Sequence, residues 1–274
     1  MSRYTVSGPP GSALTALYRY RGFVAAEVAR QFRAKYHGSA LGVSWTLLNP
    51  LAMILIYTLV FSQLMGARLP ALDSPFAYAT YVCSGLLTWG LLQDVLTRSV
   101  GLFIVYANLI KKVAFPTSTL LAIVVLTALL DFGLIFGVFL LLLAVTGSLP
   151  GLVLAALLPL LALQLALATG LGLLIAVLNV FFRDLGHITA IALRLWFWLT
   201  PIVYPVTILP DWVRVWVQGL NPMAPLVDGY QRVLLLQEWP HWSSLWLPAL
   251  AAAVAICSGL TLYRTRAGEL IDEL

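Results

Sequence analysis

The stretch that decides the fold is residues 117–178, TSTLLAIVVLTALLDFGLIFGVFLLLLAVTGSLPGLVLAALLPLLALQLALATGLGLLIAVL, which carries a single formal charge, Asp131. A helix on the surface of a soluble domain needs a polar face, and this stretch offers none. Helices that are apolar on all sides suit the hydrocarbon of a bilayer, which about 20 residues cross. The stretch therefore predicts two consecutive membrane spans, at residues 118–145 and 152–181.

The composition extends this interpretation to the whole chain. Hydrophobic residues make up 61% of the 274 residues and charged residues 10%, whereas an ordinary soluble domain has about 25% charged residues. Four further apolar stretches predict spans at residues 45–65, 78–100, 188–205 and 245–263. The predicted fold is therefore an all-α polytopic membrane protein with six transmembrane helices. We expect one six-span domain over residues 41–274.

The distribution of basic residues predicts the orientation. With the N-terminus in the cytoplasm, the Lys and Arg residues of the loops fall on the cytoplasmic side except for three, Arg68, Arg214 and Arg232. Cytoplasmic loops of membrane proteins carry an excess of Lys and Arg. Both termini are therefore predicted to be cytoplasmic. Residues 1–11 are polar and contain no apolar core of a signal peptide, and we expect them to be disordered.

The segment 12–40 has the pattern of an amphipathic helix. One face gathers apolar residues three or four positions apart: Leu14, Leu17, Val24, Val28 and Phe32. Three arginines project on the opposite side: Arg19, Arg30 and Arg33. A basic helix of this kind lies in the membrane surface with its arginines among anionic headgroups. A helix that packs on a partner protein remains an alternative, and the two interpretations are compatible.

The segment 206–244 is external in this orientation, yet it is rich in tryptophan and proline. Asp211 and the pair Asn221–Pro222 predict the starts of two short helices, neither long enough to cross a bilayer. Tryptophan concentrates at membrane interfaces, so we expect both helices to dip into the outer interface as short re-entrant elements. Irregular backbone at membrane depth survives only where protein or water satisfies it. The segment therefore predicts the outer mouth of a pathway.

Within the spans, polar and aromatic residues are the candidates for a conduit. Asp131 lies near the middle of its span and predicts either a polar pathway or a hydrogen bond to a neighbouring helix. Five aromatic residues either belong to interfacial belts or line a conduit for sugar rings: Tyr57, Tyr81, Trp89, Trp196 and Trp198. Trp196 and Trp198 cannot share one helix face. Gly133–Gly137 and Ala166–Gly170 have the spacing of close helix packing.

Several motifs of chemistry are missing from the sequence. It contains no G-x-x-x-x-G-K-[ST] phosphate loop, no H-E-x-x-H and no paired-cysteine metal site. We therefore expect a chain that is no enzyme, splits no ATP and binds neither a metal nor a cofactor of its own.

Four stretches together resemble a known family: YHGSALGVSW at residues 36–45 leading to Asn49–Pro50, LIKKVAFP at 109–116, NVFFRDL at 179–185 and LNPMAP at 220–225. The chain is similar from about residue 18 to 264 to the ABC-2 type transporter permeases that export polysaccharides such as O-antigen, capsule and teichoic acid. The resemblance implies a multi-pass protein of the bacterial inner membrane. It also implies a homodimer that works with two copies of a separate ATPase, which would bind ATP and Mg²⁺. The expected substrate is a lipid-linked polysaccharide, with no nucleic acid involved.

The resemblance also assigns residues. A cytoplasmic helix between the second and third spans would dock on the ATPase through Asn108, Leu109, Ile110, Lys111 and Lys112. The loop with Arg183 and Asp184 would lie on the same face. The helix at 12–40 would be the interface helix of the family. The external gate would comprise Pro201, Tyr204, Pro205, Trp212, Asn221 and Pro222.

Three alternatives stay open at this point. An ABC-2 exporter of a drug or a small lipid would share the same layout. A membrane enzyme acting on polyprenyl lipids would need charged groups gathered at one membrane face, where only Arg183 and Asp184 lie close together. A proton-coupled carrier would rest on Asp131 alone.

Overall fold

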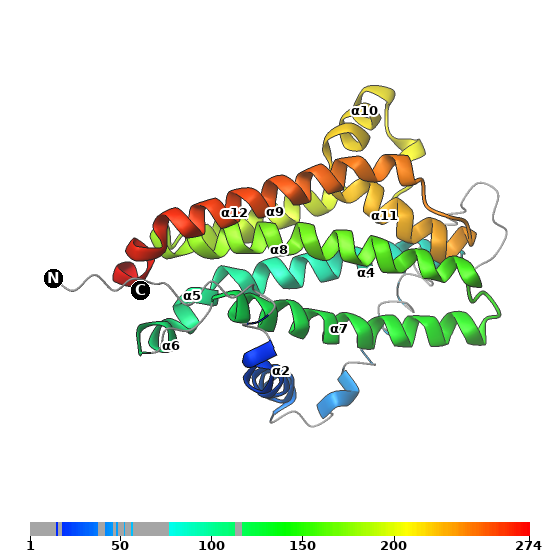
Figure 1. Cartoon of the computed structure of the whole chain (residues 1–274). Helices are drawn as coiled ribbons and strands as arrows, with labels where there is room; N and C mark the ends of the chain where they lie inside the picture. The colour runs from blue at the N-terminus through cyan, green and yellow to red at the C-terminus, as the bar shows by residue number, and fades with distance from the viewer. Residues whose placement is uncertain are drawn as a thin grey trace.

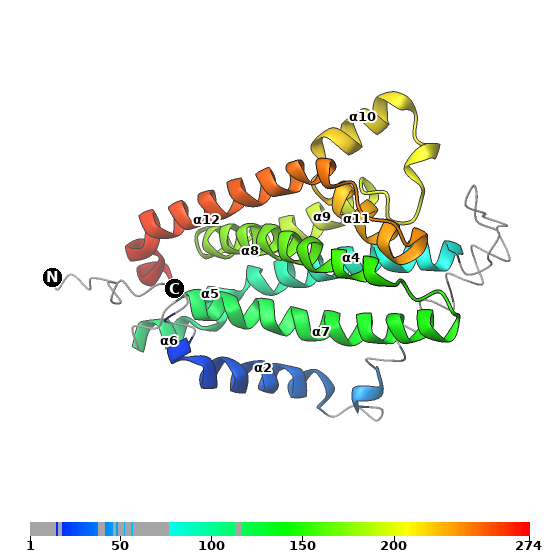
Figure 2. The ribbon, with the colours of Figure 1, turned by 45° about the vertical axis from the view of Figure 1, so that its right-hand side comes forward.

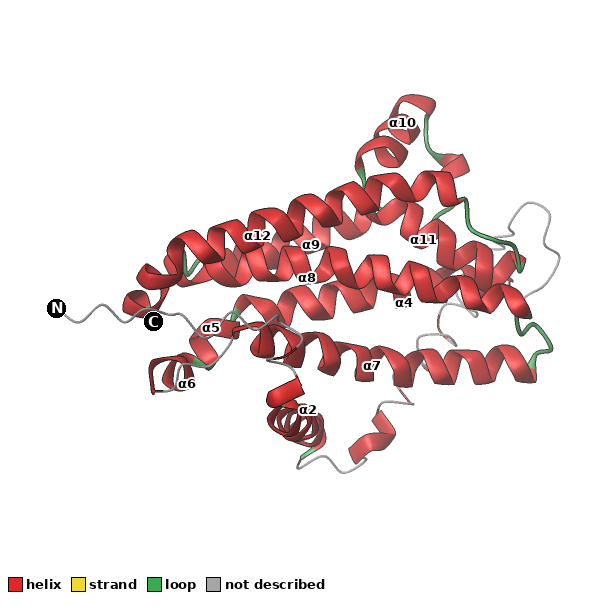
Figure 3. Cartoon of the chain, in the orientation of Figure 1, coloured by secondary structure: helices red, strands yellow, loops and turns green. Residues whose placement is uncertain are grey.

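The computed structural model describes Thr15, residues 18–37, 42–45, Leu48, Ala52, Ile56, and residues 77–112 and 117–274. Throughout these residues the regular elements are helices (Figure 3). In chain order they are α2 (Arg21–Tyr36), η1 (Gly42–Ser44), α4 (Ala77–Val100), α5 (Leu102–Val105), α6 (Ala107–Lys112), α7 (Thr117–Val145), η3 (Leu152–Ala156), α8 (Leu157–Phe181), α9 (Leu185–Trp198), η4 (Val206–Ile208), α10 (Asp211–Leu220), α11 (Met223–Gln231), η5 (Arg232–Leu236), η6 (Trp242–Leu245) and α12 (Trp246–Glu273).

The long helices form one bundle whose neighbours along the chain alternate in direction. In Figure 1, α4, α7, α8, α9 and α12 lie lengthwise across the picture. The short helices α5 and α6 lie at one end of the bundle, where the chain also ends, and α10 and α11 lie toward the other (Figures 1 and 2). We call these two ends the α6 end and the α10 end.

Three helical segments are long and apolar enough to cross a membrane: residues 119–145, 152–181 and 242–273. They agree with the spans predicted at 118–145, 152–181 and 245–263. The predicted span 78–100 corresponds to α4, whose 24 residues match it in length but are less apolar. The predicted span 45–65 falls mostly outside the described residues. The chain is a membrane-embedded protein, and the part described here supplies three such segments rather than six.

The fifth predicted span differs from the expectation. It begins at Leu185 and its helix, α9, ends at Trp198 after 14 residues. About 20 residues are needed to cross a bilayer, so α9 alone is too short. Pro201 and Pro205 follow directly, and a proline inside a helix removes a backbone hydrogen bond and clashes with the preceding turn. The chain from 199 to 210 is accordingly bent and irregular.

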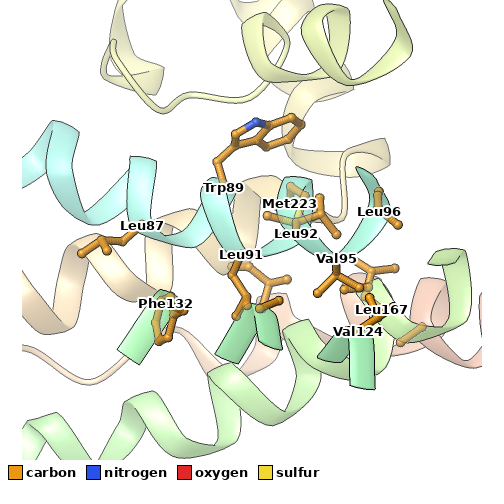
Figure 4. Close-up of a cluster of buried hydrophobic side chains, with 14 of the residues drawn as sticks. Leu87, Trp89, Leu91, Leu92, Val95, Leu96, Val124, Phe132, Leu167 and Met223 are labelled. Atoms are coloured by element: carbon orange, nitrogen blue, oxygen red, sulfur yellow. The ribbon is translucent and has the colours of Figure 1, made fainter. Parts of the chain in front are cut away.

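The core is centred on α4, which contacts α7, α8, α9 and α11. Figure 4 shows Val95 of α4 beside Val124 of α7 and Leu167 of α8, all three of them buried. Helices α8 and α12 approach closely at Gly170, where an added Cβ would stand 2.6 Å from the backbone nitrogen of Ile256. The predicted packing role of Gly170 is therefore confirmed.

The other small-residue pair behaves differently. Gly133 and Gly137 lie on an exposed face of α7, and an added Cβ at either would meet nothing within 4 Å among the residues described. Their spacing therefore packs no helix of this protomer within that part of the chain.

Helix α2 turns two of the predicted apolar residues inward, but its inner side also holds buried Glu27, so its apolar face is narrower than predicted. Val24 and Val28 are buried against the bundle, whereas Arg19, Arg30 and Arg33 are exposed. Figure 1 views α2 almost end-on while α7 lies lengthwise, so the two helices cross where they meet. Such a crossing is compatible with a helix that lies in the membrane surface.

The two short helices after the bend are not alike. Helix α10 turns Trp212 and Trp216 outward, as an interfacial helix should. Helix α11 packs against α4, with Met223, Leu226 and Val227 fully buried. The expectation that both helices dip into the outer interface is therefore wrong for α11. Its residues are apolar on nearly all sides, and a helix of that kind is buried in protein.

Candidate functional site

The bend after α9 is held by tyrosine hydroxyl groups. Backbone carbonyls that the bend frees from the helix accept four hydrogen bonds: from Tyr78 to Val203 at 2.5 Å, from Tyr81 to Tyr204 at 3.0 Å and to Pro201 at 3.4 Å, and from Tyr204 to Trp198 at 2.7 Å. Within a membrane, such carbonyls need partners from the protein itself. Tyr81, Pro201 and Tyr204 are thus brought together, and the bend is a built feature of the fold.

Asn221 joins the end of α9 to the start of α11. Its Oδ1 accepts hydrogen bonds from the indole of Trp196 at 2.8 Å and from the backbone N–H of Met223 at 3.0 Å. Its Nδ2 donates to the hydroxyl of Thr200 at 2.9 Å and to the carbonyl of Leu199 at 3.2 Å. A buried asparagine that makes four bonds has used its whole capacity. The sequence predicted a helix start at Asn221, which its bond to Met223 provides, but not this wider role.

Two of the predicted pathway aromatics contact each other. The ring of Trp89 meets the edge of Trp196 at 5.7 Å between centroids and that of Phe197 at the same distance. Its indole donates to Gln93 at 2.8 Å, and Trp89 is buried. Trp198 is 65% exposed, so the two tryptophans of α9 lie in different environments, as predicted. Tyr57 lies outside the described residues.

The remaining residues predicted for the external gate lie near this cluster along the chain. Pro205 precedes η4 and Pro222 precedes α11, both half-buried. Trp212 is exposed near the start of α10. Asp211 is the first residue of α10 and makes no side-chain cap there.

A second polar cluster surrounds Asp131 inside the bundle. Arg98 of α4 donates to Asp131 at 2.8 Å and to Asp94 of its own helix at 2.8 Å. The ammonium of Lys35, near the end of α2, lies 3.1 Å from the other oxygen of Asp131. Two carboxylates are thereby balanced by two cations, and three helices meet. Asp131 therefore makes the inter-helix bond that the sequence offered as one of two interpretations.

A third cluster ties α2 to the turn before α6. Glu27 is buried and accepts hydrogen bonds from Arg30 at 2.7 and 2.6 Å, from Gln31 at 3.2 Å and from the hydroxyl of Tyr106. Gln31 also donates to the Tyr106 hydroxyl at 3.0 Å. The bond from Arg30, more than any other contact, lowers the pKa of Glu27 to about 2. Burial, together with the Glu27 carboxylate, raises the pKa of Tyr106 to about 12. The sequence reasoning missed this cluster.

The α6 end presents a mixed apolar and basic surface. Asn108 and Lys111 are exposed on α6, whereas Leu109 and Ile110 are half-buried against the core of this chain. Lys112 completes the helix. Val105, just before α6, is 72% exposed. Asn108 and Lys111 are therefore more accessible to a partner than the two apolar residues of the predicted docking face.

The turn between α8 and α9 lies at the same end of the bundle (Figure 1). Its three residues, Phe182, Arg183 and Asp184, are all exposed. In the part of the chain that the structure describes, no three His, Cys, Asp or Glu side chains are grouped as a metal site would require.

Comparison with known proteins identifies the family to which the chain belongs. The family model described as ABC-2 type transporter matches residues 24–235. The O-antigen export system permease protein RfbA of Myxococcus xanthus is 32% identical over 259 residues, which cover 94% of this chain and 97% of that protein. A protein of the same name from Klebsiella pneumoniae is 30% identical over 75% of this chain and 77% of its own length. The polysialic acid transport protein KpsM of Escherichia coli is 25% identical over 86% and 90%.

Proposed function

The chain belongs to the ABC-2 type transporter family, and we propose that it is the permease subunit of an ATP-driven exporter of a lipid-linked polysaccharide of the O-antigen kind. The observation that carries this proposal is the relative from Myxococcus xanthus, an O-antigen export permease that matches nearly end to end. The polysialic acid transporter, though more distant, also moves a polysaccharide. Relatives of both kinds favour a glycan over a drug or a small lipid.

Permeases of this family work with a separate ATPase subunit, and we place its docking surface at the α6 end. Lys111 and Asn108 would meet the ATPase together with Lys112, and Arg183 and Asp184 would extend the same surface. Exposed Phe182 and Val105 give it apolar contacts, which supply affinity while the charges orient the partner. ATP and Mg²⁺ would bind on that partner. This chain would remain a transport subunit without catalysis of its own.

The orientation follows from the same assignment. The α6 end would face the cytoplasm of a bacterium, with both termini on that side and α10 outside. Residues 12–40 would form the interface helix, with Arg19, Arg30 and Arg33 among lipid headgroups, and residues 41–274 the transmembrane domain. Basic residues gather at the proposed cytoplasmic end, as they do in membrane proteins generally.

The polymer would pass between two copies of this chain. Trp89 is buried, and its ring contacts Trp196. Among the predicted pathway aromatics that the structure describes, exposed Trp198 and half-buried Tyr81 would be the residues that contact sugar rings. An aromatic face binds the apolar face of a sugar while hydroxyls remain free. The bend from 199 to 205, with Asn221, Pro222 and Trp212, would form the external gate. Asp131 would brace the helices, because it is already paired with two cations.

The direct test is reconstitution with the partner ATPase from the same host. In proteoliposomes, the complex should hydrolyse ATP faster when the host's extracted lipid-linked glycan is present, and should move that glycan across the bilayer. Glycan transfer by this chain without any ATPase, or no response of hydrolysis to the glycan, would contradict the proposal. A lipid extract freed of its glycan by hydrolysis serves as the control.

A further inference from the structure

The three polar residues of α2 that face the rest of the protein lie on one line. Glu27, Gln31 and Lys35 follow each other at intervals of four residues, which places them on one side of a helix. Glu27 and Gln31 bind the hydroxyl of Tyr106, and Lys35 pairs with Asp131. The two attachment points are eight residues apart, about 12 Å along the helix.

The first attachment point is mechanically tied to α6. Tyr106 immediately precedes that helix, and its carbonyl accepts the hydrogen bonds of Leu109 and Ile110, each at 3.0 Å. The backbone of Tyr106 therefore begins α6 while its side chain is bound by α2. Any displacement of α6 must either move α2 with it or break the bonds from the Tyr106 hydroxyl.

The second attachment point connects α2 to two long helices of the bundle, α7 and α4. Asp131 lies on α7 and is shared between Lys35 of α2 and Arg98 of α4. Arg98 is fixed in turn by Asp94. A shift of α2 along its axis therefore acts on a charge pair that joins α4 to α7. Rigid helices and ion-pair networks of this kind are the physical means by which two sites become coupled.

We propose that α2 transmits the movement of α6 to the α4–α7 pair, with Glu27 and Lys35 as its positioning residues. The inference rests on the proposed function, in which an ATPase docks on α6, and it adds the route by which docking acts on the spans. At one end the element is attached through the Tyr106 hydroxyl, and at the other through the Asp131 carboxylate. A role of α2 in transmission also gives a reason for the contact of Asp131 with Lys35 in addition to Arg98.

Two models of α2 can be distinguished by breaking its two attachment points singly and together. In one model α2 transmits movement, and in the other the two contacts act independently. If α2 carries movement in series, breaking either attachment interrupts the same route, and breaking both adds nothing. If the two contacts affect export independently of each other, their free-energy effects add, as is usual for sites that are not coupled. The readout must be the amount of glycan exported per ATP hydrolysed, because a loss of stability alone lowers both quantities together.

The experiment uses the full chain with its ATPase in proteoliposomes and the host's extracted lipid-linked glycan as probe. Tyr106→Phe removes one hydroxyl, and Lys35→Met removes one charge at similar length. Each variant should retain ATP hydrolysis and lower export per ATP about fivefold, the scale of one lost hydrogen bond of ordinary net strength. The double variant should be no worse than the more severe single one.

Two matched controls accompany these variants. Tyr263→Phe removes a hydroxyl that makes no hydrogen bond to the residues the structure describes and should leave the ratio unchanged; the Tyr263 ring stacks on Phe103. Lys35→Arg keeps the cation and should preserve coupling. If Lys35→Met fails to insert, Lys35→Gln takes its place with the same expected result.

The outcomes separate the two proposals. Should the wild-type complex export no glycan, the proposed function itself fails. An active wild-type complex whose ratio is unchanged in Tyr106→Phe or in Lys35→Met overturns the role of α2. So does a double variant about 25-fold below wild type, which is the product of two independent losses of fivefold.

Discussion

Arg98 of α4 and Asp131 of α7 form a partly buried ion pair of 2.8 Å that joins two helices of the apolar bundle. Charged groups in such surroundings are stable only when they are paired. Asp94 and Lys35 complete the set, so that removing different members leaves different residual charges. The structure therefore predicts different losses of unfolding free energy for substitutions of Asp131 and of Arg98.

Asp131→Asn should be the milder change. The amide still accepts a hydrogen bond from Arg98, and Arg98 retains Asp94, so we expect a loss of about 1–2 kcal/mol in unfolding free energy. Arg98→Leu leaves two carboxylates beside one cation and should cost more than Asp131→Asn. Thermal unfolding in detergent measures both. If Asp131→Asn abolishes export at normal protein level while Lys35→Met, which removes the same ion pair, does not, Asp131 does more than brace the helices and hold α2, and a proton-coupled role returns.

Lys111→Ala combined with Lys112→Ala should weaken the ATPase complex about tenfold or more, because two cations leave the proposed docking surface. Insertion of the chain into the membrane should be normal. Co-purification of the ATPase measures the effect. Arg264→Ala, an exposed cation near the end of the chain, is the matched control. Equal recovery of the ATPase with the double variant and with wild type would place docking elsewhere.

Asn221→Ala should destabilise the α10 end by about 2–3 kcal/mol, since it leaves buried donors and acceptors without partners. Thr200→Val removes only one of the four bonds of Asn221 and should cost less. Tryptophan fluorescence follows the change, because the Trp196 indole is one of the freed donors. A Thr200 variant as damaging as the Asn221 variant would show that the asparagine is not the centre of this cluster.

Gly170→Ala should force α8 and α12 apart. The new methyl group would stand 2.6 Å from a backbone nitrogen and 2.8 Å from the carbonyl carbon of Ala255, atoms that cannot turn aside. Overpacking of this kind costs about 1–3 kcal/mol or more. Gly133→Ala is the control, since nothing described lies within 4 Å of its methyl group. Unfolding measurements that find the two variants equal would contradict the close approach at Gly170.

Glu27 predicts a specific dependence of stability on pH. Its folded pKa of about 2 lies below the ordinary value of 4.5, so its bonds stabilise the fold fully above pH 4.5 and are lost as the pH falls toward 2. Between pH 8 and pH 5 the attachment of α2 should not change. The unfolding midpoint should fall more steeply from pH 5 to pH 3 in wild type than in Glu27→Gln. Parallel curves would mean that the carboxylate has no such role.

The sequence predicted what depends on local pattern. Unbroken apolar stretches predicted α7, α8 and α12, and the alternation of Val24 and Val28 with arginines predicted the faces of α2. The family resemblance, carried by short motifs, is confirmed by the comparisons. Asp94 and Arg98 lie four residues apart on a helix, a spacing that favours an ion pair, but the sequence analysis did not predict this pair.

What the sequence did not predict depends on contacts between distant segments. Nothing local shows that Tyr106 reaches Glu27, or that Lys35 reaches Asp131, because these pairs form only when α2 crosses the bundle. The burial of α11 was missed for the same reason. The tryptophans in this segment suggested a helix at the membrane interface, whereas the apolar residues of α11 pack against α4. The docking, pathway and gate assignments stay predictions.

The shortness of α9 has a consequence for the surrounding lipid. Its 14 residues extend about 21 Å, whereas the hydrocarbon of a bilayer is about 30 Å thick. Its exposed residues include apolar Ile191 and Leu195 as well as His187 and Arg194. We expect the membrane beside α9 to thin locally to match it. A lipid headgroup that crosses the membrane beside this helix would then pass through a thinner hydrocarbon layer than elsewhere around the protein.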